Sequence, residues 1–232
     1  MDTEIESWRI RSFVLRAGRM SRAQKRSYET LFPLYGLKGD ETGHMDFEQL
    51  FGNSNPVVVE IGFGMGIATA TIAEKNPGIN YLGIDVHRPG IGRLLWEIEN
   101  RNLKNIRIIE GDAVVFLTQK VKDSRVSAFH IFFPDPWPKK RHHKRRLVTR
   151  PFTGLLAAKL IPGGYVYMVS DWVEYGEWAL KELSATPGLV NKYPLFAKHQ
   201  DWRPQTEFER KGLKKNHEVR ELFFLKAQWS VM

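Results

Sequence analysis

The stretch "VVVEIGFGMG", residues 57–66, decides the fold. Its first five residues are apolar except Glu60, a composition typical of a strand buried on both faces. The glycines that follow allow a tight turn, in which the backbone can approach a ligand closely. Residues 67–77 predict a helix stopped by Pro77. The stretch therefore predicts a buried strand, a glycine turn and a helix, the first unit of an α/β fold.

The same alternation continues on the carboxyl side of this unit. Further strands are expected at residues 79–85, 106–113, 126–137 and 165–171, and helices at 89–102, 113–121, 151–164 and 172–186. Residues 218–231 alternate as an antiparallel strand does. Alternating buried strands and helices predict a mostly parallel sheet with helices on both faces. Ligands of such sheets bind beyond the carboxyl ends of the strands.

The residues before the first strand have a different composition. Residues 1–30 carry seven basic residues, from Arg9 to Arg26, against four acids, and their apolar periodicity is weak. We interpret them as a basic arm or a loosely held helix, and residues 31–54 as a polar connector. The expected organisation is therefore an arm with its connector over residues 1–54 and one α/β domain over residues 55–232.

The composition indicates which kind of partner the protein binds and in which cellular compartment it works. The 232 residues carry a net charge of +9 with an isoelectric point near 9.7, which favours a polyanionic partner such as nucleic acid over a merely solvated basic surface. Cysteine is absent, which excludes disulfides and thiolate metal sites. No apolar run reaches the roughly 18 residues of a membrane span, and the amino terminus lacks an apolar secretory segment. A cytoplasmic protein is the expectation, with no membrane association and no obligatory protein partner indicated.

Acidic residues stand at the ends of four predicted strands. They are Glu60, Asp85, Asp112 and Asp135. Each alone is better explained as a helix cap or a solvated loop acid, but the predicted sheet brings all four to one crevice. Asp85 also lies nineteen residues after Gly66, the usual place for an acid that binds a ribose diol. A carboxylate-lined crevice repels the phosphates of NAD and suits the sulfonium, ribose hydroxyls and amine of S-adenosylmethionine (SAM).

A basic strip follows the last of these acids. Asp135 lies between two prolines, and seven of the residues 139–150 are Lys or Arg. A solvated charge run is the usual meaning of such a segment, but its place directly after Asp135 favours contact with RNA phosphates. His142 and His143 have no Cys or acid at ligand spacing, so no metal site is predicted.

The sequence resembles the bacterial tRNA (guanine-N7)-methyltransferases over nearly its whole length. The matching segments are "RIRSFVLRAGRMSRAQ", "EIGFGMG", "GIDVHRPG", "FFPDPWPKKRHHKRR", "SDW" and "TEFERKG". The segment "FFPDPW" with the basic strip is the specific part, whereas the glycine turn alone is common. The resemblance implies a Rossmann-like SAM-dependent methyltransferase fold, with a seven-stranded sheet and an antiparallel strand near the end.

The resemblance also implies roles for individual residues. Asp135 is the expected catalytic residue, and the expected SAM-binding residues are Glu60, Gly62, Gly64, Gly66, Asp85, Asp112 and Asp135. The guanosine is expected to contact Lys139, Asp171, Thr206, Glu207, Phe208 and Glu209. From their place in the strip, we expect Lys140, Arg141, Lys144, Arg145 and Arg146 to bind RNA. One departure is Asp85, where the family commonly has Glu; Asp keeps the diol-binding chemistry.

The expected reaction is methylation of the variable-loop guanosine 46 of tRNA at N7. The N7 atom carries a lone pair in the major groove, so it needs no deprotonation before it attacks a methyl group. Two alternatives remain from the sequence: a SAM-dependent methyltransferase acting on another RNA base, and a non-catalytic RNA-binding module. A pure RNA binder gains nothing from four acids in its crevice, which argues against the second alternative.

Overall fold

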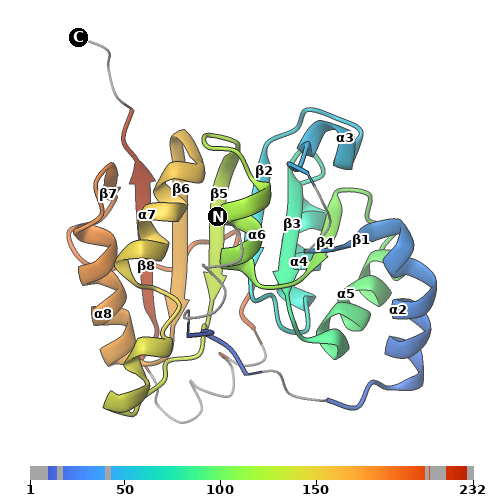
Figure 1. Ribbon diagram of the computed structural model, residues 1–232, viewed down its shortest axis with the longest axis horizontal. Coiled ribbons are helices and arrows are strands. Elements are labelled where there is room, and N and C mark those ends of the chain that lie inside the picture. Colours follow the sequence, from blue (N-terminus) through green and yellow to red (C-terminus); the bar gives the residue numbers. More distant parts are fainter. Residues whose placement is uncertain (1–9, 15–17, 40–42, 207–208, 210–217, 229–232) are drawn as a thin grey trace.

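A single eight-stranded sheet forms the centre of the protein (Figure 1). The computed structural model describes residues 10–14, 18–39, 43–206, 209 and 218–228. The strands run in the order β1-β4-β3-β2-β5-β6-β8-β7. Their bounds are β1 Gly36–Lys38, β2 Val57–Ile61, β3 Asn80–Asp85, β4 Ile106–Glu110, β5 Val126–Phe132, β6 Leu160–Ser170, β7 Leu189–Asn191 and β8 Arg220–Lys226. Strands β1 to β6 are parallel, and β8 is antiparallel to both β6 and β7.

The predicted α/β architecture is confirmed, including the antiparallel strand near the end of the chain. The sheet has eight strands instead of seven because β1, three residues long, adds to the edge strand β4. The expected helix over residues 151–164 ends earlier, at Lys159. Residues 160–164 instead begin β6, where the pairing with β5 shifts register between Val126 and Ala128. Gly163 turns the chain there with a φ of +77°, so the glycines belong to a bulged strand and not to a helix end.

Helices cover both faces of the sheet, as predicted. Their bounds are α2 Arg22–Tyr35, α3 Phe47–Phe51, α4 Ile67–Lys75, α5 Arg88–Asn100, α6 Ala113–Lys120, α7 Arg150–Lys159 and α8 Val173–Ser184, with a 3₁₀ helix η1 at Lys140–Arg145. One core joins α3, α6, α7 and α8 to the sheet, and the other joins α2, α4 and α5. Along β2, Val57 and Val59 enter the first core and Val58 the second. The strand period of two therefore turns Glu60 toward the α4 and α5 face.

The amino-terminal region is more structured than the predicted arm and connector. Helix α2 begins with a capping box, in which Ser21 N donates to Gln24 Oε1 at 2.8 Å and Gln24 N donates to Ser21 Oγ at 3.2 Å. It packs against α5 at Gly92, where an added Cβ would lie 2.5 Å from Gln24 O. Residues 22–51 therefore contain the helices α2 and α3 and the short strand β1. The division into a basic arm with its connector over residues 1–54 and one α/β domain stays a prediction. Among the described helices, none combines the length and the hydropathy needed to cross a bilayer.

Candidate active site

The glycine turn between β2 and α4 borders open space. Gly62, Gly64 and Gly66 have φ values of +74°, +59° and +69°, a backbone region that favours glycine. A Cβ added to Gly62 or Gly64 would have no atom within 4 Å, whereas one on Gly66 would lie 2.6 Å from Leu94 Cβ. The first two glycines therefore leave room for a ligand to approach the backbone. Gly66 is required for packing of the turn against α5.

Asp85, at the end of β3, holds this turn in place. Its Oδ2 accepts a hydrogen bond from Gly64 N at 2.9 Å, and its Oδ1 accepts from Val86 N at 2.7 Å and His87 N at 2.9 Å. Burial raises the pKa of Asp85, and these backbone donors oppose the rise. The carboxylate is thus fixed beside the glycine turn, with one acceptor site on Oδ2 left for a ribose hydroxyl.

Glu60 is a buried carboxyl with an unused acceptor. It is 2% exposed, and its Oε2 has no hydrogen-bond partner among the described residues. Burial raises its pKa to about 7, and the negative charge of Asp85 contributes to the rise. A buried polar atom without a partner costs free energy. A ligand with a positively charged or N–H donor group would satisfy it, so the donor set around the glycine turn fits SAM.

Asp112 and its neighbour Glu110 lie at the end of β4. Asp112 is the N-cap of α6, and its Oδ1 accepts from Val114 N at 2.9 Å and Val115 N at 3.4 Å. Glu110, which sequence reasoning did not select, binds Arg88 Nε at 2.7 Å and also contacts Tyr28 and Lys38. The polar contacts of Glu110 join α2, β1 and α5 to β4. Its place within the predicted strand at residues 106–113, directly after two isoleucines, was the available signal.

The loop after β5 presents Asp135 to solvent between two strained residues. Asp135 is exposed. Phe133 has a φ of +50° and Trp137 a φ of +46°, values that non-glycine residues rarely adopt. Phe133 N donates to Val169 O at 2.8 Å, and Trp137 Nε1 donates to Ser12 O at 3.1 Å. Contacts from β6 and from the amino-terminal segment therefore fix this loop at both ends.

The basic strip divides into exposed and inward-facing residues. Lys139, Lys140, Arg141 and Lys144 are exposed. Arg145 lies over Trp137, with 4.2 Å between the guanidinium carbon and the ring centroid, and its Nη2 donates to Phe13 O at 3.1 Å. Arg146, which was also expected to bind RNA, has a side chain that is 0% exposed, and each of its guanidinium nitrogens donates to a protein acceptor.

The expected guanosine-binding residues lie at the end of β6 and in the segment before β8. Asp171 directly follows β6 and is partly buried, next to Trp172, which is 39% exposed. Thr206 and Glu209 are joined because Glu209 N donates to Thr206 Oγ1 at 3.0 Å. Glu207 and Phe208 lie outside the described residues.

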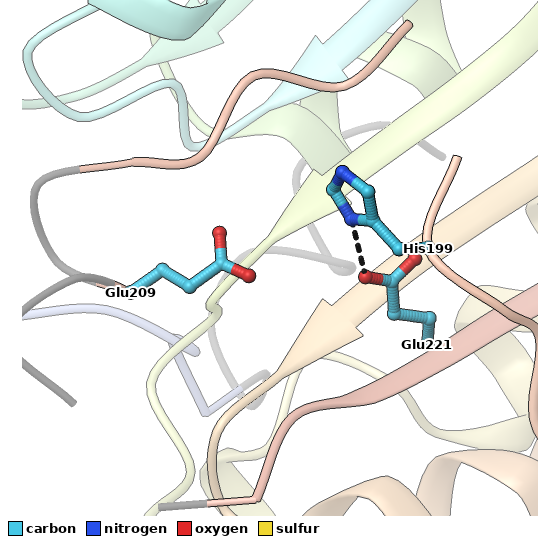
Figure 2. A group of neighbouring side chains, drawn as sticks. All are labelled: His199, Glu209 and Glu221. Atoms are coloured by element: carbon cyan, nitrogen blue, oxygen red, sulfur yellow. Dashed lines mark hydrogen bonds and ion pairs between the residues drawn. The ribbon is translucent and has the colours of Figure 1, made fainter. Parts of the chain in front are cut away.

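Glu209 belongs to a buried charge network around Arg203, which the sequence did not reveal. Figure 2 shows three side chains of this network, His199, Glu209 and Glu221, with the contact between His199 and Glu221 dashed. Arg203 donates to Glu209 at 2.6 and 2.8 Å and to Glu221 at 2.7 Å, and its Nη2 lies 3.0 Å from His199 Nδ1. Burial opposes ionisation of Glu209, but the Arg203 guanidinium holds its pKa below the usual value. His199, Glu209 and Glu221 have the spacing of metal ligands. Arg203 already supplies the positive charge among them, so we assign the cluster as an ion-pair network.

The sheet order places the candidate residues side by side at the carboxyl ends of the parallel strands. Strands β4, β3, β2, β5 and β6 are consecutive neighbours, and their carboxyl ends carry Asp112, Asp85, Glu60, Asp135 and Asp171 in that order. The strand order reverses at β2, with β3 on one side and β5 on the other, which is where ligands bind in open α/β sheets. The exposed strip begins four residues after Asp135. The row of strand-end acids and the start of the basic strip thus meet at Asp135.

Comparison with known proteins identifies methyltransferases, as the sequence resemblance implies. A family model described as "Putative methyltransferase" matches residues 54–222. The chain is 47% identical over 220 residues to the tRNA (guanine-N(7)-)-methyltransferase of Nitrosospira multiformis, covering 94% of this chain and 95% of that protein. It is 45% identical over 221 residues to the protein of the same name from Alkalilimnicola ehrlichii, covering 94% and 93%.

Solved structures show the same fold at low identity. The crystal structure of the 16S rRNA methyltransferase KamB aligns with a TM-score of 0.59 and 15% identity, over 84% of this chain and 100% of that one. TrmN from Thermus thermophilus aligns with a TM-score of 0.52 and 16% identity, over 78% of this chain and 47% of that one. These two alignments support the fold alone.

Proposed function

The chain belongs to the tRNA (guanine-N7)-methyltransferase family, and on this premise we propose that it transfers the methyl group of SAM to N7 of guanosine 46 in the variable loop of tRNA. The observation that carries the proposal is the position of Asp135. This exposed carboxylate stands between an acid-lined sheet edge and an exposed basic strip. A tRNA substrate also implies that the protein acts in the cytoplasm.

The glycine turn and the two buried acids would hold the cofactor. Gly62 and Gly64 leave space beside the backbone, Asp85 offers its remaining acceptor site to a ribose hydroxyl, and Glu60 offers its unused oxygen to a donor. When bound, SAM supplies a methyl group made electrophilic by its sulfonium. The acidic surroundings favour this positively charged cofactor over a dinucleotide with two phosphates.

Asp135 is the residue assigned to the reacting base. Methylation at N7 gives the guanine ring a positive charge, which spreads to the ring N–H groups. A carboxylate that accepts a hydrogen bond from this edge stabilises the charge as it develops. No strong base is needed, because the N7 lone pair is free before the reaction. The fixed backbone on either side of Asp135 keeps the carboxylate in place and contributes to alignment.

The exposed part of the strip is assigned to the RNA backbone. Lys139, Lys140, Arg141 and Lys144 can neutralise phosphates and bring the variable loop to the crevice. Lys139, four residues after Asp135, is near enough in sequence to contact the target guanosine as well. Asp171, Thr206 and Glu209 complete the proposed guanosine side, where the ion pair with Arg203 holds Glu209 in position.

The test is methylation of unmodified tRNA with SAM labelled in its methyl group, followed by nucleoside analysis. We expect labelled 7-methylguanosine, and none when guanosine 46 of the tRNA is replaced by adenosine. A label in another nucleoside would favour the methyltransferase acting on another RNA base. Binding of tRNA without any transfer would favour the non-catalytic RNA-binding module.

A further inference from the structure

Arg146 is a buried cation at the end of an exposed basic strip. Its side chain is 0% exposed, although the neighbouring residues Lys140, Arg141 and Lys144 face solvent. Its Nε donates to the carbonyl oxygen of Pro136 at 2.9 Å. Its Nη1 and Nη2 donate to the two carboxylate oxygens of Glu174, on α8, at 3.0 and 2.5 Å. Each nitrogen of this guanidinium therefore has a protein acceptor.

The surroundings of Arg146 fix the orientation of the guanidinium. Its central carbon lies 5.1 Å from the ring centroid of Tyr175 and 5.1 Å from that of Trp178, both on α8. Hydrogen bonds from Arg146 lower the pKa of Glu174, which keeps the carboxylate ionised. Planar bidentate pairing and ring stacking are properties of arginine that lysine does not reproduce. Helix α8 thus holds the guanidinium rigidly against the loop.

The acceptor that Arg146 contacts lies next to Asp135. Pro136 follows Asp135 directly, and the strained residue Trp137 comes next, with a φ of +46°. A strained backbone persists only when the surrounding structure holds it. Hydrogen bonds reach this loop from β6 at Phe133, from Ser12 at Trp137 and from Arg146 at Pro136, and Arg145 lies over the ring of Trp137. Of these hydrogen bonds, the one from Arg146 is made to the residue that directly follows Asp135.

We propose that Arg146 is a positioning residue, which fixes the Pro136 carbonyl and thereby the place of the Asp135 carboxylate, and that it does not bind RNA phosphate. This inference rests on the proposed methyl transfer. It predicts that loss of the Arg146 hydrogen bond displaces Asp135 and lowers the rate of the bound complex, while the affinity for tRNA is retained. If Arg146 instead bound an RNA phosphate, loss of this contact would lower the affinity for tRNA and leave the rate of the bound complex unchanged.

The experiment compares Arg146→Lys with the control Arg101→Lys. Arg101, at the end of α5, pairs with Glu97 at 2.8 Å and with Glu74 at 2.9 Å, and its side chain is 24% exposed. At saturating SAM and tRNA, we expect Arg146→Lys to lower kcat between about 10-fold and 100-fold, the scale of a small misplacement of reacting groups. KM for tRNA and the salt dependence of tRNA binding should equal those of the parent. Arg101→Lys should have the parent kcat.

A second variant covers the case in which Arg146→Lys does not fold. Glu174 is 52% exposed, so Glu174→Gln leaves the core intact while it removes the charge that orients Arg146. We expect a smaller fall in kcat with the same unchanged salt dependence. A parent kcat in Glu174→Gln would overturn the positioning role.

A double-mutant cycle separates positioning from a general loss of stability. If Arg146 acts through Asp135, Asp135→Asn should lower kcat much less in the Arg146→Lys background than in the parent. Additive effects would overturn the inference, because they would mean that the two residues act independently. Absence of 7-methylguanosine with the parent protein would instead overturn the proposed function. A parent rate in Arg146→Lys would overturn the positioning role alone.

Discussion

Asp85 Oδ2 accepts a hydrogen bond from Gly64 N at 2.9 Å, which ties the glycine turn after β2 to the end of β3. The two residues come from neighbouring strands at the point where the strand order reverses. Loss of this carboxylate would therefore remove a cofactor contact and also release the backbone of the turn.

The first prediction is that Asp85→Ala weakens SAM binding by about 1–3 kcal/mol, the cost of losing a hydrogen bond to a charged group. The measurement is calorimetric titration with SAM or S-adenosylhomocysteine in the absence of RNA. NAD should not bind. Asp123→Ala is the control, because Asp123 is an exposed acid paired with Lys159 near the opposite end of β5. Unchanged SAM affinity in Asp85→Ala would contradict the assignment.

Glu60 gives a prediction about pH and stability. Its pKa is about 7 in the folded protein against an ordinary 4.5, so the folded state holds the proton more tightly than the unfolded state does. The stabilising effect of this proton is fully present below pH 4.5 and is lost as pH rises to about 7. Compared with Glu60→Gln, the parent should lose up to about 3 kcal/mol of unfolding free energy over that interval. Urea unfolding of both proteins at several pH values measures this difference. A difference that is independent of pH would show that Glu60 is ionised in the fold.

The strand-end acids could be predicted because the information is local. An apolar run identifies a buried strand, a glycine turn marks its carboxyl end, and parallel order places Glu60, Asp85 and Asp135 on one edge. The sequence cannot show which of these acids are held by backbone donors. Asp85 and Asp112 both cap the turns that follow them, a role that the sequence could not distinguish from ligand binding.

The buried arginines could not be predicted because their partners are distant in the sequence or unremarkable there. Arg146 belongs to a run of cations that is typical of a solvated surface, and Glu174, its partner, is 28 residues away. Arg203 lies in a segment without clear periodicity, and its burial depends on β8 bringing Glu221 beside it. The apolar periodicity of residues 1–30 is weak as a whole, and α2, which begins within this stretch, is covered by α5, far along the chain.

Arg203 leads to a second stability prediction. Its removal in Arg203→Met would leave Glu209 and Glu221 buried without a cation, which should destabilise the protein by about 3–5 kcal/mol near pH 7. The loss should shrink at acidic pH because protonation removes the repulsion between the carboxylates. Thermal unfolding against pH tests this. The further changes Glu209→Gln and Glu221→Gln should restore part of the stability, and equal losses at neutral and acidic pH would contradict the ion-pair assignment.

The exposed residues of the basic strip lead to a prediction about the salt dependence of tRNA binding. Replacing Lys140, Arg141 and Lys144 with Ala should weaken tRNA binding and reduce its log–log salt slope by about 0.7–0.9 for each phosphate that is no longer neutralised. SAM affinity should remain that of the parent. The control replaces Lys75, Lys104 and Lys122 with Ala, since these exposed residues lie where α4 ends and where β4 and β5 begin, on the opposite edge of the sheet. A parent slope in the strip variant would mean that another surface binds the RNA.

The last prediction concerns the carboxylate of Asp135. Asp135→Asn keeps the size of the side chain and some of its hydrogen bonding, but it removes the negative charge. If this charge stabilises the positive guanine ring, single-turnover methylation at saturating SAM and tRNA should slow by about 10²-fold or more. Binding of tRNA should change much less, because phosphate contacts dominate the affinity. Folding should be unaffected, since Asp135 is exposed.

Cofactor affinity must be measured for the same variant, because Asp135 is also an expected SAM-binding residue. A rate that recovers when more SAM is added would assign Asp135 to cofactor binding, whereas a slow rate under full saturation assigns it to the transition state. Methylation at the parent rate under saturation would show that the loop serves only as a turn. In that case, alignment of the methyl group with N7 would account for the catalysis without help from this charge.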